Sequence, residues 1–145
     1  MKVFLNTNIL LDLLLDRAPH AEAAESLLAV IEAGKAQGFV SGITVSNLYY
    51  ILHDLNKRKD PLPSIASLLS FLEVVPTSKK ILLDAMENGF KDYEDGIQYA
   101  SALTARCTHL VTRNTKDFRK ASLSVVTAAE ACSLLTIAKT LDRLG

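Results

Sequence analysis

The sequence has few cysteines, and this scarcity argues against several kinds of site. Among its 145 residues only Cys107 and Cys132 are cysteines, and they lie far apart. They form neither a C-x-x-C pair nor the spacing of a disulfide framework. The three histidines, His20, His53 and His109, are scattered and lack the spacing of a zinc site. The simplest interpretation is a protein of the reducing cytoplasm.

Long hydrophobic runs and an excess of either charge are also missing. The apolar stretch before Asn6 is too short for a signal peptide or a membrane span, so we expect no membrane association. The 16 basic and 16 acidic residues give a formal net charge of zero. The whole chain therefore does not attract a nucleic-acid backbone, although a local basic patch can. The length and the 49% hydrophobic content predict one globular domain over residues 1–145.

What is present is an alternation of short β-like runs with longer helical patterns. We expect strands at Lys2–Leu5, Gly38–Ser41, Glu73–Val75, His109–Thr112 and Leu123–Val126. We expect helices at about Asn8–Leu15, Pro19–Ala36, Val45–Lys57, Pro63–Phe71, Lys79–Asn88, Glu94–Cys107 and Ala128–Leu144. Helices inserted between strands imply crossovers and a mostly parallel sheet. The predicted fold is a three-layer α/β/α domain around a sheet of about five strands.

Polar side chains gather where the predicted strands end. Asn6–Asn8 follow the first strand, Ser41 ends the second, and Thr112–Asn114 lie at the end of the fourth. Asp95 lies in the first turn of the helix that leads into the fourth strand. In open α/β sheets, sites form beyond the carboxyl ends of the strands. We therefore expect these side chains to share one cleft.

Three segments concentrate Asp, Asn and Thr at these positions: LNTNILLD (5–12), KDYEDGIQYASA (91–102) and LVTRNTKDF (110–118). Clustered carboxylates repel one another and raise each other's pKa. A divalent cation relieves that repulsion, and Mg²⁺ and Mn²⁺ prefer oxygen ligands. Such an ion activates water and stabilises an anionic phosphoryl transition state. The pattern indicates a site for Mg²⁺ or Mn²⁺.

With these segments in this order, the chain resembles the PIN-domain family, including the bacterial VapC-type toxins. The segments FLNTNILLDLL, GFVSGITVSNLYYIL, DYEDGIQYASA and LVTRNTKDF carry the resemblance over nearly the whole chain. The resemblance implies a ribonuclease that acts on RNA with Mg²⁺ or Mn²⁺. It also implies a frequent homodimer, and often an antitoxin protein as the partner that blocks the site.

The resemblance assigns catalytic and metal-ligand roles to Asn6, Asp95 and Asp117. The family's first acid falls at Asn6 and its second close to Asn47, so the chain departs from the family pattern at both positions. An amide oxygen still coordinates a cation but carries no charge. We therefore expect this chain to bind metal poorly and to cleave RNA slowly if at all. The acidic stretch Asp92–Asp95 could supply some of the charge that is missing at Asn47.

The neighbours of these three positions are assigned supporting roles. They are Thr7, Asn8, Asn47, Asp92, Glu94, Thr112 and Asn114, of which the last two would orient water or phosphate. Basic residues beside them, namely Arg113, Lys116, Arg119 and Lys120, are candidates to hold RNA phosphates. Asp12 is expected at the edge of the site and Asp16 in solvent.

Simpler roles stay open for each residue taken singly. Glu94 and Asp95 could serve only a helix N-terminus, and Thr7 or Asn8 could serve only as a helix cap. Independent caps, however, have no reason to occur in this order on one edge of a sheet. Tyrosines in the run VSNLYYIL fit a core or a dimer face better than base stacking, so we expect a homodimer through part of Val45–Leu55.

Two other functions compete with the ribonuclease. A non-catalytic PIN-like module that binds RNA or protein is favoured if the native gene encodes Asn6, since that residue is either natural or an inactivating replacement. A phosphotransfer receiver domain is also α/β. It needs an acidic pair after the first strand and an aspartate at the end of a middle strand. Here amides follow the first strand, and the middle strand EVVP ends in proline.

Overall fold

The fold, taken from a computed structural model that describes residues 1–119 and 121–145, is built on a fully parallel sheet of five strands. The strands are β1 (Lys2–Leu5), β2 (Gln37–Ser41), β3 (Leu72–Val75), β4 (His109–Val111) and β5 (Ser124–Val126), in the order β3-β2-β1-β4-β5. The helices are α1 (Thr7–Leu14), α2 (Ala21–Glu32), α3 (Gly42–Leu55), α4 (Leu62–Leu69), α5 (Lys79–Glu87), α6 (Tyr93–Thr104), the 3-10 turn η1 (Thr115–Phe118) and α7 (Ala128–Leu144).

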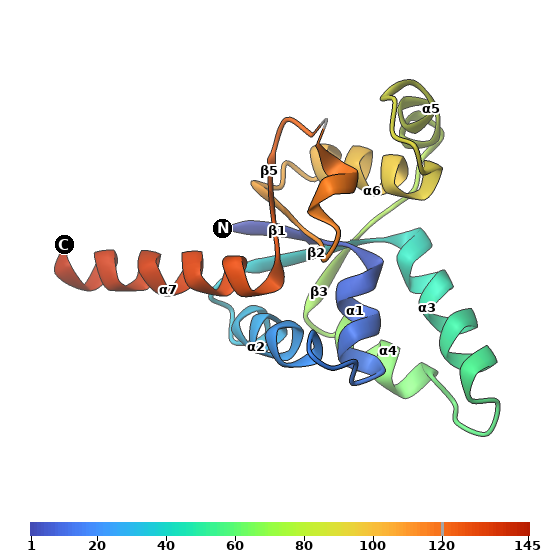
Figure 1. The fold of residues 1–145 in the computed structure, drawn as a ribbon, viewed down its shortest axis with the longest axis horizontal. Helices are drawn as coiled ribbons and strands as arrows, with labels where there is room; N and C mark the ends of the chain where they lie inside the picture. The colour runs from blue at the N-terminus through green and yellow to red at the C-terminus, as the bar shows by residue number, and fades with distance from the viewer. Residues whose placement is uncertain (120) are drawn as a thin grey trace.

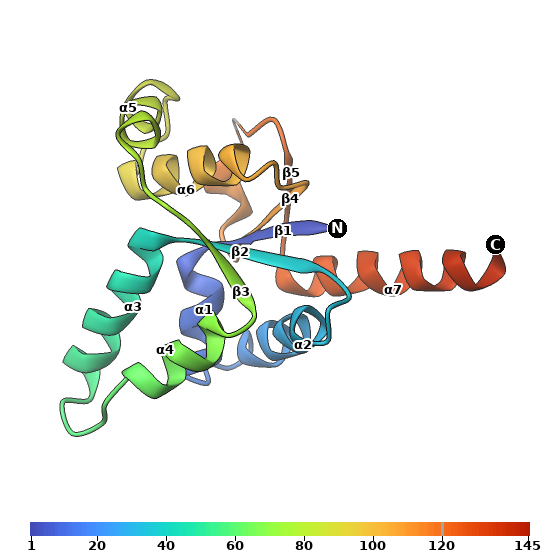
Figure 2. The ribbon, with the colours of Figure 1, turned by 180° about the vertical axis from the view of Figure 1, so that it is seen from behind.

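Helices cover both faces of this sheet, as Figures 1 and 2 show. The side chains of β1 alternate between the two resulting cores. Phe4 packs in one core with residues of α5, α6 and η1, such as Ile81 and Ile97. Val3 and Leu5 pack in the other core with residues of α1, α2, α4 and α7. The predicted three-layer α/β/α fold with a parallel sheet is confirmed.

Short polar side chains start most of the helices. Asn6, Ser41, Ser78, Asp92 and Thr127 each accept a hydrogen bond from a backbone N–H in the first turn of the helix that follows. Such caps satisfy donors that have no partner within the helix. Asn6 and Thr127 directly follow β1 and β5, and Ser41 is the last residue of β2, so capping is what turns the chain at the carboxyl edge of the sheet.

The structure moves some predicted boundaries. Helix α3 starts three residues earlier than expected, because the Ser41 side chain accepts a hydrogen bond from Ile43 N at 3.2 Å and starts the helix at once. The turn η1 was not expected as a helix, since four residues give no periodic signal. The predicted bounds of β1 and α7 are confirmed, and α7 carries a full capping box.

The central strand β1 places its last residues in the middle of the carboxyl edge. Asn6 continues the ladder by donating its backbone N–H to Val111 O at 2.9 Å. At one side of the molecule, α7 projects beyond the sheet, and the C-terminus lies at its free end (Figure 1). No helix within the described residues has both the length and the apolar character of a membrane span.

Candidate active site

The first strand delivers Asn6 to the carboxyl edge in a fixed position. Asn6 is only 5% exposed, and its Oδ1 accepts a hydrogen bond from Asn8 N at 3.3 Å. Its side chain also forms a hydrogen bond that lowers the pKa of the Asp95 carboxyl. The asparagine therefore caps α1 and contacts the acid that faces it from α6.

Acids gather around the start of α6. Asp92 caps this helix by accepting a hydrogen bond from Asp95 N at 3.1 Å, and Glu94 and Asp95 lie in the first turn. Burial, followed by the charges of Asp92 and Asp117, raises the pKa of Asp95 from 3.8 to about 6, against the hydrogen bond from Asn6. Glu94 adds a smaller increase. The raised pKa of Asp95 therefore reflects its burial first and the negative charge gathered at this edge second.

Asn47 and Glu94 lie in direct contact. Asn47 Nδ2 donates to Glu94 Oε1 at 3.0 Å, and the same oxygen accepts a hydrogen bond from Gln98 Nε2 at 3.4 Å. A carboxylate thus lies beside the position where the resemblance expects an acid and the chain has an amide. The contribution of this carboxylate to the site stays a prediction.

Gln98 and Thr44 belong to this network, although sequence analysis did not single them out. Gln98 Oε1 accepts from Thr7 N, and its Nε2 donates to Thr7 Oγ1, both at 3.2 Å. Thr44 Oγ1 lies 2.9 Å from Thr7 Oγ1. The one available signal was spacing, since Gln98 follows Glu94 by one helical turn and Thr44 precedes Asn47 by nearly one.

The loop after β4 is fixed by Asn8. Its Nδ2 donates to Thr112 Oγ1 at 3.3 Å, and its Oδ1 accepts from Arg113 N at 3.2 Å. Thr112 Oγ1 also accepts from Asn114 N at 3.2 Å. Asp117 follows in η1, where it is exposed. A side chain of α1 therefore sets the conformation of the loop that leads to Asp117.

One open cavity of about 340 Å³ unites these elements. Nearly all the predicted catalytic and supporting residues line it, namely Asn6, Thr7, Asn8, Asp92, Glu94, Asp95, Thr112, Asn114 and Asp117. Asn47 is not part of the lining but contacts Glu94, which is. The sequence prediction of a shared cleft at the carboxyl edge agrees with this placement except for Ser41 and Arg113, which do not line the cavity.

The predicted basic residues occupy different environments. Lys116 and Arg119 are exposed beside the acidic cavity, in or next to η1. Arg113 points its Nε to within 3.4 Å of Asp12 Oδ2. Lys120 lies outside the described residues. The RNA contacts assigned to Arg113, Lys116 and Arg119 stay predictions.

Comparison with known proteins identifies the fold family. Residues 2–116 match the family described as PIN domain. The chain belongs to the PIN-domain family. It is 29% identical over 136 residues to Ribonuclease VapC1 of Aquifex aeolicus (strain VF5). The aligned residues cover 90% of this chain and 93% of that protein.

Chains in solved structures have a similar fold. A toxin-antitoxin complex from Klebsiella pneumoniae contains a chain that is 28% identical, with a TM-score of 0.64 over 87% of this chain and 97% of that one. A chain of VapBC-1 from nontypeable Haemophilus influenzae is 18% identical, with a TM-score of 0.63 over 88% and 98% of the two chains. The family match removes the receiver-domain alternative.

As a PIN domain with Asn6, this chain falls short of a complete metal centre. Over residues 1–119 and 121–145, no group of three or more His, Cys, Asp or Glu side chains is arranged to hold a metal ion. The charges of Asp95 and Asp117 repel each other. Asn6, which follows the central strand, carries an amide and adds no negative charge to this pair. The residues present therefore do not fit a divalent-cation site of the kind that the resemblance implies.

Proposed function

We propose that this chain has the architecture of an Mg²⁺- or Mn²⁺-dependent endoribonuclease of the PIN type, impaired by the asparagine at position 6. The observation that carries the proposal is the convergence of Asn6, Asp95 and Asp117 on one cavity, where Asp95 has a pKa of about 6. A bound divalent ion would supply charge neutralisation and an activated water. Cleavage of single-stranded RNA by the Asn6→Asp variant tests the proposal.

The competing function is a PIN-like module that binds RNA or protein without cleaving it. The observation that favours it is the missing acid itself, because Asn6 is well accommodated as a helix cap that also bonds Asp95. RNA remains the expected ligand under both proposals. The Asn6→Asp variant separates them, because a module that has lost catalysis altogether would stay inactive.

A single cytoplasmic domain is the setting that we propose for this activity. Both cores are shared between elements from the first and last parts of residues 1–145, which supports one domain. Cys107 and Cys132 are free thiols. A reducing compartment and an RNA substrate together favour the cytoplasm.

A homodimer through α3 is the assembly that we propose. Only Thr44 and Leu48 of this helix are buried, while Tyr50 and Leu55 are each 62% exposed. We expect light scattering at micromolar concentration to give twice the mass of the 15.8 kDa chain. The double variant Tyr50→Asp, Leu55→Asp should be monomeric, because two charges on this face disfavour its burial. A parent chain that is monomeric at high concentration would refute this assembly.

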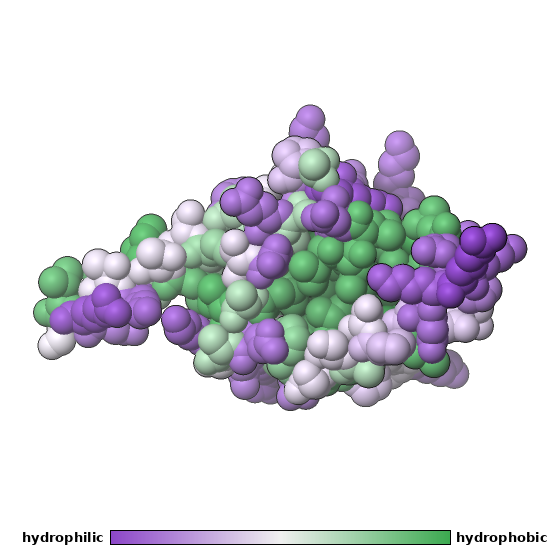
Figure 3. All heavy atoms as spheres, turned by 90° about the horizontal axis from the view of Figure 1, so that it is seen from below, coloured by the Kyte–Doolittle hydropathy of each residue, from purple (hydrophilic) through white to green (hydrophobic). Residues whose placement is uncertain are grey.

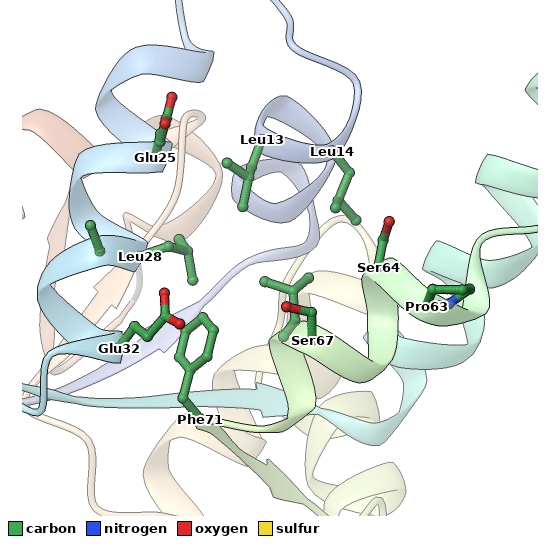
Figure 4. Close-up of a pocket in the computed structure, with 11 residues that line it drawn as sticks. Leu13, Leu14, Glu25, Leu28, Glu32, Pro63, Ser64, Ser67 and Phe71 are labelled. Carbon is green, nitrogen blue, oxygen red and sulfur yellow. The ribbon is translucent and has the colours of Figure 1, made fainter.

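An antitoxin is the protein partner that we propose, and the chain offers an apolar groove for it. Figure 3 shows apolar side chains crossing the face that carries α1, α2 and α4. The groove there, of about 540 Å³, is lined by Leu13, Leu14, Leu28 and Phe71 among others, with Glu25 and Glu32 on the α2 side (Figure 4). Apolar side chains flanked by basic ones would complement this surface.

Co-expression with the product of the adjacent gene tests this partner. The two proteins should co-purify from the parent chain, and Leu14→Glu should weaken the complex because it adds a third acid to an apolar lining. The control is Leu83→Glu, at an exposed position on the opposite layer. Equal recovery of the complex from both variants would place the partner elsewhere.

A further inference from the structure

A buried carboxylate lies next to the acidic cavity without lining it. Asp12, on α1, is 1% exposed. Its Oδ2 lies 3.4 Å from Arg113 Nε, and its Oδ1 lies 4.0 Å from Arg17 Nη1. Asp12 Oδ1 and Arg113 Nε have no hydrogen-bond partner within the described part of the chain. Two guanidinium groups therefore balance one carboxylate, and the cluster keeps a net positive charge.

Arg113 connects this cluster to the acidic cavity. It stands between Thr112 and Asn114, both of which line that cavity, and Asn8 holds its backbone N–H at 3.2 Å. The side chain of Arg113 instead lines a second cavity, of about 290 Å³, on the adjacent face of α1. One loop thus contributes residues to both cavities.

Part of the second cavity carries positive charge, although apolar residues such as Ile9, Pro19 and Ala23 also line it. Besides Arg113 and Asp12 it is lined by Thr127 and Ala128, which start the 17-residue helix α7. The N-terminus of a helix carries partial positive charge, which the carboxylate of Glu130 partly offsets here by accepting a hydrogen bond from Thr127 N. Arg113 Nε is buried against Asp12, whereas the side chain as a whole is 33% exposed. The polar atoms that Arg113 can offer to a ligand are therefore its two Nη groups.

We propose that this second cavity binds a phosphate of the RNA strand, and that this phosphate neighbours the phosphate that lies in the acidic cavity. Arg113, which lines this cavity, is the phosphate contact. Asp12 is the positioning residue that holds Arg113, and it also pairs with Arg17, which adds positive charge nearby without lining the cavity. The inference rests on the proposed function, because RNA is the ligand. A guanidinium already held by a carboxylate loses less freedom on binding, and its planar fork matches a phosphate.

The sign of one effect separates positioning from simple charge. An acid near an RNA site repels the strand, so its removal strengthens binding when charge alone matters. If Asp12 positions the arginines, its removal weakens binding even though the net charge rises from zero to +1. The matched control is Asp16→Asn, which makes the same chemical change at an exposed position near the end of the same helix.

The experiment measures binding of a labelled single-stranded RNA to the full chain with Asn6, by fluorescence anisotropy in chelator. We expect Asp12→Asn and Arg113→Gln each to weaken binding about fivefold or more. Asp16→Asn should leave affinity unchanged or raise it. Arg113→Gln should also reduce the slope of log affinity against log salt by about 0.7, the value for one phosphate of a single strand. Thermal melts verify that each variant is folded.

Two further variants keep the test decisive if Asp12→Asn is unstable. Arg113→Lys keeps the charge but not the fork, and should recover only part of the lost affinity. Asp12→Asn should cause no additional loss in the Arg113→Gln, Arg17→Gln background, because Asp12 acts through these arginines.

The inference is overturned if Asp12→Asn binds RNA as tightly as Asp16→Asn, or if its loss persists without the arginines. It is also overturned if the parent chain binds no RNA at low salt. None of these results bears on cleavage by the Asn6→Asp variant, which decides the proposed function separately.

Discussion

Replacing Asn6 with aspartate is expected to convert a chain with little or no activity into one that cleaves single-stranded RNA with Mg²⁺ or Mn²⁺. Position 6 is 5% exposed and is fixed by a backbone hydrogen bond to β4, so the new carboxylate would lie beside Asp95. A full charge about 4 Å from a cation at a partly buried site contributes several kcal/mol before desolvation is subtracted. A net gain of about 1.4 kcal/mol already tightens cation binding tenfold.

The assay compares parent and variant, purified identically, with Mn²⁺, with Mg²⁺ and with chelator. The control for a contaminating nuclease is the double variant Asn6→Asp, Asp117→Asn, which adds one acid and removes another. It should lose most of the gained activity, since Asp117 lines the same cavity. Activity that is equal in all preparations, or absent from the single variant on every RNA tested, would contradict the lost-acid account and favour the non-catalytic module.

The second large effect concerns stability. Asp95→Asn is expected to raise the free energy of unfolding at pH 7 in chelator by about 1 kcal/mol, a value well below the full electrostatic cost because the side chain is partly exposed to solvent. Burial and the neighbouring acids Asp92 and Asp117 raise the pKa of Asp95 from 3.8 to about 6, so the ionised carboxylate is disfavoured in the folded chain. Asparagine keeps the shape of the side chain and removes the repelled charge.

The raised pKa of Asp95 also predicts a dependence of stability on pH. Between pH 3.8 and about 6 the folded chain retains a proton on Asp95 that the unfolded chain has lost. The contribution of Asp95 to stability therefore falls as pH rises through this window, and is flat above it. Urea unfolding of parent and Asp95→Asn at several pH values should show the difference growing over this range.

The exposed carboxylate of Asp142 provides the control for this experiment, because Asp142→Asn should show no such trend. A different outcome is expected if Asp95 serves only the dipole of α6. In that case Asp95→Asn would lower stability by about 0.3–1 kcal/mol at pH 7. A clear loss of stability in chelator would therefore argue against a repelled acidic cluster.

Much of the fold could be predicted because its signals are local. The apolar run Val3–Leu5 and the helical pattern over Ala128–Leu144 each define an element without reference to the rest of the chain. Helix α3 was predicted to begin too late because Ser41 reads equally well as the end of a strand and as a cap. The turn η1 depends on the burial of Phe118, which no local pattern reveals.

The candidate site could be predicted where polar side chains follow a strand, as Asn6 and Thr112 do. Contacts between distant segments could not. The hydrogen bond of Asn47 to Glu94 and the ion pair of Asp12 with Arg113 join residues that only the folded sheet brings together. Gln98 was overlooked because a single polar residue within a helix looks the same in the sequence whether it faces solvent or a buried network.

The most direct test of the central claim is a calorimetric titration with Mn²⁺ of the parent, of Asn6→Asp and of Asn6→Asp combined with Asp95→Asn. If one missing charge at position 6 limits the site, Asn6→Asp should bind Mn²⁺ at least about tenfold more tightly than the parent. The double variant should lose that gain, because the two carboxylates hold the ion together. Equal Mn²⁺ affinity of the parent and Asn6→Asp would contradict the claim.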